Sequence, residues 1–311
     1  MKQLVKDLLI SAGLGFLLPG MFLNYGARVQ QRIQAPVQTE VSVSAPVRVR
    51  GPEGTVTDGD LEEYLVGVVL AEMPAFFEEE ALKAQAVVAR TYARKALETG
   101  GKHGDGSVCC APSCCQGHCT EEDYLLRGGT QEGIGKIRNA ADATAGQVLT
   151  YGGELIEATY FSCSGGRTED AAAVWGTEFP YLRTVESPGE QKAVYHLSEQ
   201  VFTKSEVEAA LGVSLEEEII EQVSYTQGGG VETAWIGGKY FTGTEVRALL
   251  GLRSTAFSME AVGENIVVTT KGYGHRVGMS QYGADAMAVA GGTYEEILAH
   301  YYPGTELSQL Q

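Results

Sequence analysis

The sequence predicts an α+β fold in which mixed helices and antiparallel strands surround a substrate cleft, with a single N-terminal transmembrane helix. An uncharged apolar segment at residues 8–27, helix-forming sequence at residues 61–97, and later strand-like segments that alternate with short helices support this prediction. The chain has 311 residues, 44% of them hydrophobic, which is enough for a sizeable core. Its formal net charge of -17 repels polyphosphate, so we expect no nucleic-acid binding.

The N-terminal segment at residues 8–27 is a candidate membrane span. About 20 helical residues span roughly 30 Å, the thickness of a bilayer's hydrocarbon core. A retained transmembrane anchor and a cleaved signal peptide both fit residues 1–27, although Pro19 weakens the helix. We favour the anchor, because residues 24–27 (NYGA) make a poor small-residue cleavage site. Basic residues flank both sides, so charge alone does not set the orientation.

Residues 28–50 are rich in Gln, Val, Pro and Ser, a composition typical of an extended tether. Alternating residues at the end of this segment predict an edge strand near Val47. We expect the folded domain to occupy residues 51–311 and its first element to lie near Thr55. No solenoid-length repeat is seen there, so one compact domain is the simplest assignment, although two lobes also fit the sequence.

Two helices should open the folded domain. Asp60 and Glu63 form a plausible capping box for a helix over residues 61–73, which Pro74 ends. Residues 78–97 predict a second helix, because they are strong helix formers with an apolar stripe and no internal Gly or Pro. This second helix should pack in the core.

The rest of the domain mixes short helices and strands after a Cys-rich loop at residues 103–119. The expected helices cover residues 139–144, 204–211, 244–250, 284–290 and 294–301, and the expected strands cover residues 147–150 and 155–162. Residues 231–241 are typical of a hairpin with Gly237 and Gly238 at its turn. This mixture of elements indicates α+β.

Glu72 is a candidate proton donor at the end of the first helix, where its neighbours are apolar. Burial would raise the pKa of this carboxyl, so it could stay protonated near neutral pH and act as a general acid. An exposed glutamate at a helix end explains the same residue equally well. On the next helix, Lys83 and Arg90 share a basic face, which could hold Glu72 or bind sugar and peptide groups. A solvated helix face is the alternative.

A second segment, FSCSGG, places Ser162 and Ser164 at a turn where the backbone can approach a ligand closely. We do not interpret Ser162 as a nucleophile, because no Gly-x-Ser-x-Gly elbow surrounds it. Downstream, Trp175 and Tyr181 could form an aromatic platform for sugar rings, and core packing explains them equally well.

A third segment, GYGHRVGMSQYG, concentrates His275, Gln281 and Tyr282 among glycines. Such a density of polar side chains is unusual for a structural turn and indicates a site loop. His300 and Tyr301, farther along, are better explained by packing.

Five of the six cysteines fall within residues 103–119: Cys109, Cys110, Cys114, Cys115 and Cys119. Adjacent cysteines do not easily bridge each other, whereas thiolates joined by His103 or His118 could form a tetrahedral zinc site that closes the loop. Two disulfides with one thiol left over are the alternative in an oxidising compartment.

Taken together, EEYLVGVVLAEMPAFFEEEALKAQAVVARTYA, FSCSGGRTEDAAAVWG and GHRVGMSQYGADAMA resemble the three signature blocks of the stage II sporulation protein D family, over about residues 45–308. The related amidase-enhancer proteins share this domain. The resemblance implies a lytic transglycosylase that acts in spore engulfment on peptide-free peptidoglycan glycan strands. It would cleave between N-acetylmuramic acid and N-acetylglucosamine and leave a 1,6-anhydro product. The resemblance also implies a single-pass protein of the cell membrane, with its catalytic domain outside the cytoplasm, in the intermembrane space during engulfment.

The resemblance further implies roles for individual residues. Glu72, in the EMP block, would be the catalytic acid and base, and Lys83 and Arg90 would position substrate or orient Glu72. Other candidates for substrate binding are Tyr160, Ser162, Ser164, His275, Gln281 and Tyr282. A structural zinc ion, not required for the chemistry, would be held by His103, Cys109, Cys114 and Cys115.

Two departures from the family pattern affect these expectations. Arg276 stands where the family loop usually has glycine and would add a bulky charge beside the site. Cys114 replaces the second histidine of the zinc pattern, and Cys110 and Cys119 leave the ligand set open. The implied membrane partners are stage II sporulation proteins P and M. A non-catalytic glycan-binding enhancer of a cell-wall amidase is the alternative function, and a structural anchor in a membrane complex is a third.

Overall fold

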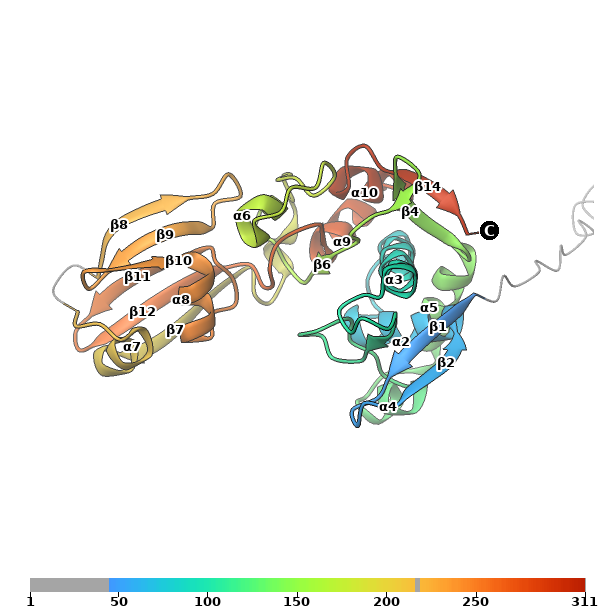
Figure 1. Ribbon diagram of the computed structural model, residues 1–311, viewed down its shortest axis with the longest axis horizontal. Coiled ribbons are helices and arrows are strands. Elements are labelled where there is room, and N and C mark those ends of the chain that lie inside the picture. The colour runs from blue at the N-terminus through green and yellow to red at the C-terminus, as the bar shows by residue number, and fades with distance from the viewer. Residues whose placement is uncertain (1–44, 216–218, 311) are drawn as a thin grey trace, which may run out of the picture. The chain divides into compact units, whose positions relative to one another are not determined.

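Helices and mainly antiparallel sheets alternate along the chain, which confirms the α+β prediction (Figure 1). The computed structural model describes residues 45–215 and 219–310. Within these two ranges, no helix has the length and apolar character needed to cross a membrane. The predicted transmembrane segment at residues 8–27 lies outside the described residues, as does most of the tether.

The first sheet has three strands: β1 (Pro46–Arg50), β2 (Val56–Asp60) and β3 (Val108–Cys109). β1 lies in the middle, antiparallel to β2 and parallel to β3. The expectation of an edge strand near Val47 is therefore wrong, and residues 46–50 belong to the folded domain rather than to the tether. Because β3 lies in the Cys-rich loop, this sheet fixes one end of that loop.

A group of helices forms the main core: α2 (Leu61–Glu72), α3 (Glu79–Thr99), α4 (Glu121–Leu126), α5 (Gln131–Ala143), α9 (Gln281–Val289) and α10 (Tyr294–Tyr301). The Asp60 carboxylate caps α2 by accepting the backbone N–H of Glu63 at 3.1 Å. α3 contacts α2, α5, α9 and α10, so this helix is the centre of the packing (Figure 1). Its small buried residues, Ala84, Ala86 and Ala89, allow close approach of these neighbours.

Two sets of short strands bring distant segments together. β4 (Gln147–Tyr151) lies between β5 (Glu154–Leu155) and β14 (Glu306–Gln309) in an antiparallel sheet. β6 (Tyr160–Phe161) pairs in parallel with β13 (Met279–Ser280). The single strand expected over residues 155–162 is therefore two short strands, and between them the Thr159 N–H bonds locally to the Glu157 carbonyl at 3.1 Å rather than to a neighbouring strand. The β6–β13 pairing joins the FSCSGG and GMSQYG segments.

Residues 197–271 form a second region with a hydrophobic core of its own, made by residues such as Phe241, Val246 and Val268. Its elements are β7 (Leu197–Thr203), α7 (Lys204–Leu211), β8 (Ile220–Tyr225), β9 (Val231–Ile236), β10 (Lys239–Thr242), α8 (Gly243–Leu250), β11 (Phe257–Val262) and β12 (Asn265–Lys271). The strands make two antiparallel sheets, β10-β9-β8 and β11-β12-β7. The predicted hairpin is confirmed, with Gly237 and Gly238 at φ 55° and 71° in its turn.

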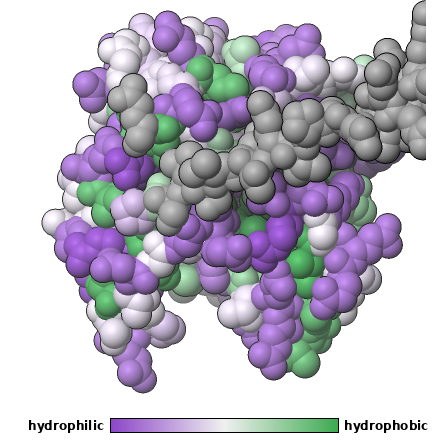
Figure 2. Space-filling view, turned by 90° about the vertical axis from the view of Figure 1, so that its right-hand side faces the viewer, coloured by the Kyte–Doolittle hydropathy of each residue, from purple (hydrophilic) through white to green (hydrophobic). Residues whose placement is uncertain are grey.

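The surface reflects the charged composition of the chain, of which 20% is Asp, Glu, Lys or Arg. On the face drawn in Figure 2, hydrophilic residues dominate, and hydrophobic residues appear between them in separate patches. The cores described above account for most of the large aliphatic side chains in the described residues.

A buried carboxylate holds two of the motif segments together. Glu190, in the short 3-10 helix Glu190–Lys192, is only 1% exposed. Its Oε2 accepts the N–H groups of Ser164 and Gly165 at 3.0 and 2.8 Å and the Ser164 hydroxyl at 2.7 Å. Its Oε1 accepts the hydroxyls of Ser187, at 2.7 Å, and Ser280. These donors replace water around the carboxylate and fix the FSCSGG turn against the start of α9.

Arg276 lies in the protein interior, 2% exposed, with a backbone φ of 65°. Its guanidinium contacts Glu169 Oε1 at 3.1 Å and donates at 2.8 Å to the backbone oxygens of Ser164, Arg167 and Gly228. The expectation of a bulky charge beside the site is therefore wrong, because these buried acceptors draw the side chain inward. The left-handed φ, costly for a residue with a Cβ, also explains why glycine suits this position.

We predict that Glu169→Gln lowers the free energy of unfolding by roughly 3–5 kcal/mol, because it leaves the buried Arg276 charge without its partner. Urea denaturation followed by circular dichroism measures the change. The control is Glu186→Gln, which breaks a surface pair with Arg167 (3.0 Å, side chains 77% and 46% exposed) and should cost less than about 1 kcal/mol. Equal, small losses in both variants would contradict a structural role for the buried pair.

Candidate active site

A cleft of about 970 Å³ brings together five of the predicted catalytic and substrate-binding residues: Glu72, Tyr160, Ser162, His275 and Gln281. Glu72 is the last residue of α2, Tyr160 lies in β6, and Gln281 begins α9. The parallel pairing of β6 with β13 places the two motif segments side by side at the cleft. Residues from all three motif segments therefore meet in one cavity.

The Glu72 carboxyl is the acidic group best suited to proton transfer in this cleft. Burial raises its pKa above the ordinary value for glutamate, and hydrogen bonds from Gly117, Gln281 and Tyr160 offset part of that shift. Its place at the C-terminus of α2 acts in the same direction as burial, because the helix dipole disfavours negative charge there. Such a carboxyl keeps its proton to a higher pH than an exposed glutamate does, as a general acid must.

Gly117, which our sequence analysis did not single out, holds Glu72 directly. Its backbone N–H donates to Glu72 Oε1, and a Cβ at position 117 would lie 2.8 Å from that oxygen. Glycine is therefore needed for the close approach. The neighbouring Gln116 accepts a hydrogen bond from the Tyr160 hydroxyl at 3.2 Å and so ties the Cys-rich loop to β6. No local motif predicts these contacts, since they depend on how the loop folds over α2.

His275 is a neutral group in the cleft wall. Burial, and then the positive charge of Arg247, lower its pKa to about 4. Its Nδ1 accepts the backbone N–H of Val277 at 3.1 Å, so the proton of the neutral ring is on Nε2. The ring packs against Phe161 and Trp175, with centroid distances of 5.7 and 5.3 Å. The Nε2–H interacts with the Tyr160 backbone, so His275 supports β6 without carrying charge at neutral pH.

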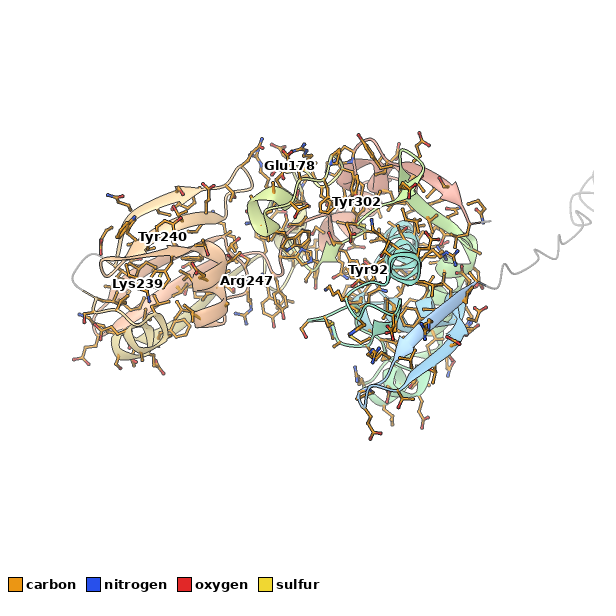
Figure 3. All side chains as sticks on the ribbon, viewed as in Figure 1. Tyr92, Glu178, Lys239, Tyr240, Arg247 and Tyr302 are labelled. Carbon is orange, nitrogen blue, oxygen red and sulfur yellow. The ribbon has the colours of Figure 1, made fainter. Side chains whose placement is uncertain are left out.

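Aromatic side chains form much of the remaining wall. Trp175, 42% exposed, lines the cleft with Phe179 and with Tyr92, which extends from α3 (Figure 3). Tyr181 does not share this role: it is buried, and its hydroxyl accepts the backbone N–H of Glu157 at 3.1 Å. The interpretation that Trp175 and Tyr181 form one aromatic platform is therefore wrong for Tyr181. Trp175 supplies the exposed ring.

Lys83 and Arg90 are not brought to Glu72. Lys83 contacts Glu79 and Glu80 on its own helix at 3.0 and 2.8 Å. Arg90 is fully buried and pairs with Glu62 at 2.6 Å, while also donating to backbone oxygens. The expectation that these residues lie beside Glu72 is corrected, because nearer acids at α2 and α3 hold both cations.

Ser164 and Tyr282 lie behind the cleft wall rather than in it. Ser164 is fully buried and bound to Glu190, as described above. The Tyr282 N–H donates to the Ser162 carbonyl at 3.1 Å, and its ring packs on Phe77 with a centroid distance of 4.9 Å. Both residues position Ser162 and the start of α9, so the expectation that they line the cleft is corrected.

The Cys-rich loop gathers the four predicted metal ligands, His103, Cys109, Cys114 and Cys115, with their ligand atoms within 4.8 Å of one another. His103 Nε2 lies 3.8 Å from Cys114 Sγ and 3.6 Å from Cys115 Sγ, and the two sulfurs are 3.9 Å apart. Around a tetrahedral zinc ion, such ligand pairs are separated by about 3.6–3.8 Å. The four side chains therefore fit a zinc ion. Cys110, Cys119 and His118 lie outside this group.

Comparison with known proteins identifies close relatives of the chain. A family model described as "Stage II sporulation protein" matches residues 50–151. The chain is 39% identical over 280 residues to "Stage II sporulation protein D" of Bacillus amyloliquefaciens, which covers 88% of this chain and 81% of that protein. It is 40% identical over 273 residues to the protein of the same name from Bacillus subtilis (strain 168), covering 86% and 79%. An "Amidase enhancer" from that strain is 32% identical over 300 residues, covering 78% of this chain and 40% of the enhancer.

We predict that Glu72→Gln raises thermal stability at neutral pH. Because the pKa of Glu72 is raised in the folded state, its ionisation above the unfolded pKa, about 4.3, destabilises the folded protein. This cost is absent below that pKa, so the melting temperatures of wild type and variant should differ near pH 7 and converge near pH 4. Thermal scans across this range measure the difference, with the exposed Glu63→Gln on the same helix as the control. A lower melting temperature for Glu72→Gln at pH 7 would contradict the raised pKa.

Proposed function

The chain belongs to the stage II sporulation protein D family, and on that premise we propose that it is a lytic transglycosylase of peptidoglycan. The bond cleaved is the one between N-acetylmuramic acid and N-acetylglucosamine in peptide-free glycan strands, during spore engulfment. The observation that carries the proposal is the Glu72 carboxyl, whose pKa is raised by burial and which lies in a cleft large enough for sugar rings. A role in sporulation and the cell wall follows from the family itself.

One carboxyl group is enough for the proposed reaction. Glu72 protonates the glycosidic oxygen, and the bond from that oxygen to C1 of N-acetylmuramic acid breaks. Glu72, now a carboxylate, takes the proton from the 6-hydroxyl of the same sugar, and the hydroxyl oxygen bonds to C1 to close the 1,6-anhydro ring. No water is consumed, whereas hydrolysing glycosidases commonly use two carboxyl groups, one of them to activate water or to attack C1.

The surroundings of Glu72 support this sequence of proton transfers. The Gly117 N–H and the Gln281 amide hold the carboxylate in place once it has lost its proton. The neutral His275 ring adds no charge beside Glu72, and Trp175 offers an exposed ring on which a sugar can stack.

We further propose that His103, Cys109, Cys114 and Cys115 bind a structural zinc ion. When bound, zinc would cross-link the Cys-rich loop and supply no group to the reaction. The same loop contains Gly117, which holds Glu72, and Cys114 and Cys115 themselves line the cleft. Ordering the loop would therefore keep the Gly117 N–H in position.

The proposal places the domain outside the cytoplasm, held at the cell membrane by the anchor at residues 1–27 and the tether that follows it, because glycan strands lie on that side. Stage II sporulation proteins P and M are the proposed membrane partners. The similarity to the amidase enhancer supports a second candidate function, in which the same cleft binds glycan without cleaving it and stimulates a cell-wall amidase.

Mass spectrometry of the products tests the proposed reaction. The full-length chain, incubated with peptide-free glycan strands, should yield 1,6-anhydromuramyl products. Glu72→Gln should lower the rate by roughly 10²–10⁴-fold, because it removes the general acid and base. Glu63→Gln is the matched control and should retain activity. Reducing-end products without anhydro sugars would indicate a hydrolase, and binding without cleavage by the wild-type chain would indicate the enhancer function.

Metal analysis tests the zinc proposal. We expect about one zinc per chain, lost in Cys115→Ser and retained in Cys110→Ser, whose thiol lies outside the ligand group. Removal of zinc by a chelator should lower the melting temperature by at least about 4 °C, because binding free energy is also folding free energy. Equal zinc content in the two variants would argue against the proposed ligands, and a metal-free wild type with an intact disulfide would support the alternative.

A further inference from the structure

A second cavity, of about 560 Å³, adjoins the active-site cleft along the side formed by α8. Arg247 and Tyr273 line both cavities, so the two cavities are neighbours. Arg253 also lines the second cavity. A polymer bound at Glu72 that extends past Arg247 would enter this space.

The charged residues that line the second cavity are two arginines, Arg247 and Arg253. Across residues 45–215 and 219–310, neither guanidinium forms an ion pair with a carboxylate. Arg247 makes a long hydrogen bond, 3.4 Å, from its Nε to the Leu252 carbonyl. Arg253 stacks on the Tyr195 ring, with its guanidinium carbon 4.3 Å from the ring centroid. What sets these two cations apart is that both line one cavity that has no acidic residue among the described residues of its lining, in a chain of net charge -17.

The position of Arg247 indicates what kind of ligand it meets. Arg247 is partly buried, and burial lowers its pKa, yet guanidinium remains charged in proteins. Partial burial of a cation without an anionic partner raises the free energy of the folded protein, and binding of an anion lowers it again. Its charge also helps to lower the pKa of His275, so its field reaches into the active-site cleft. Figure 3 shows Arg247 extending from α8.

Building on the proposed function, we propose that Arg247 and Arg253 recognise the lactyl carboxylate of N-acetylmuramic acid in the part of the strand beyond the cleaved bond. Removal of a stem peptide hydrolyses the amide on the lactyl group and leaves a free carboxylate on that sugar. A peptide-bearing strand has a neutral, bulky amide there instead. A guanidinium binds a carboxylate through two parallel hydrogen bonds, which an amide cannot accept. The arginines thus select strands from which the peptides have been removed, while Tyr273, 43% exposed, offers its ring to the sugar.

A matched pair of ligands tests this subsite. One ligand is peptide-free glycan, and the other is the same glycan with its lactyl carboxyls converted to methyl amides by carbodiimide coupling. Binding is measured with the full-length Glu72→Gln chain, which leaves the strands intact. Adding Arg247→Gln and Arg253→Gln should weaken binding of the peptide-free glycan by about tenfold or more, as expected for lost charge-assisted hydrogen bonds. Binding of the methyl-amidated glycan should change by less than about twofold.

The control is Arg127→Gln, added to the same Glu72→Gln chain, because Arg127 is exposed at the end of α4 and lines neither cavity. It should leave binding of both ligands unchanged. The preference for peptide-free glycan should also weaken as salt rises from about 0.05 to about 0.5 M, because this rise shortens the Debye screening length severalfold. Equal weakening of both ligands in the double arginine variant, or weakening of neither, overturns the proposed subsite.

Product analysis separates this inference from the proposed reaction. In these assays Glu72 is intact. If anhydro products form at equal rates from peptide-free and methyl-amidated strands, and the arginine substitutions change neither rate, the subsite is wrong and the transglycosylase proposal stands. A binding preference that depends on the arginines, together with no cleavage by the wild-type chain, would support the subsite and overturn the proposed reaction.

Discussion

A buried carboxylate is tolerated only where donors replace the water it has lost, and Glu190 obtains those donors from two loops at once. Ser164 and Gly165 come from the FSCSGG turn, and Ser280 comes from the start of α9. If either loop moved, part of the carboxylate would be left unpaired in the interior. The positions of Ser162 and Gln281 at the cleft follow from this single interaction, because each residue is adjacent in sequence to, or one removed from, a donor group.

The cleft itself combines two opposite electrostatic settings. Around Glu72, helix-end placement and burial favour the protonated acid, and the neighbouring His275 is neutral. Farther along the same wall, Arg247 carries an unneutralised positive charge. A neutral region for proton transfer next to a cationic region for anchoring suits a long ligand whose reacting bond and recognised group are different. The structure can therefore separate the choice of strand from the chemistry on it.

Local signals in the sequence predicted the helices best. Residues 204–211 and 294–301 were predicted with the bounds that the structure gives to α7 and α10, and in both a threonine cap forms a reciprocal capping box. The motif segments predicted much of the cleft, including Glu72, Tyr160 and Gln281. The contacts that could not be predicted depend on the tertiary structure. Arg90 forms its ion pair with Glu62, and Gly117 contacts Glu72 only because the Cys-rich loop folds over α2. Similarly, nothing local shows that the strand over residues 155–162 would break.

The interior pair of Arg276 and Glu169 has a consequence for how this sequence can vary. Returning position 276 to glycine would relieve the left-handed backbone, but it would leave Glu169 buried without its cation. Replacing Glu169 first would instead leave the Arg276 guanidinium buried without its carboxylate partner. Either single substitution gives a less stable protein, so we expect the two positions to change together. Arg276 and Glu169 therefore constrain each other, and neither residue can be replaced alone without leaving a buried group unpaired.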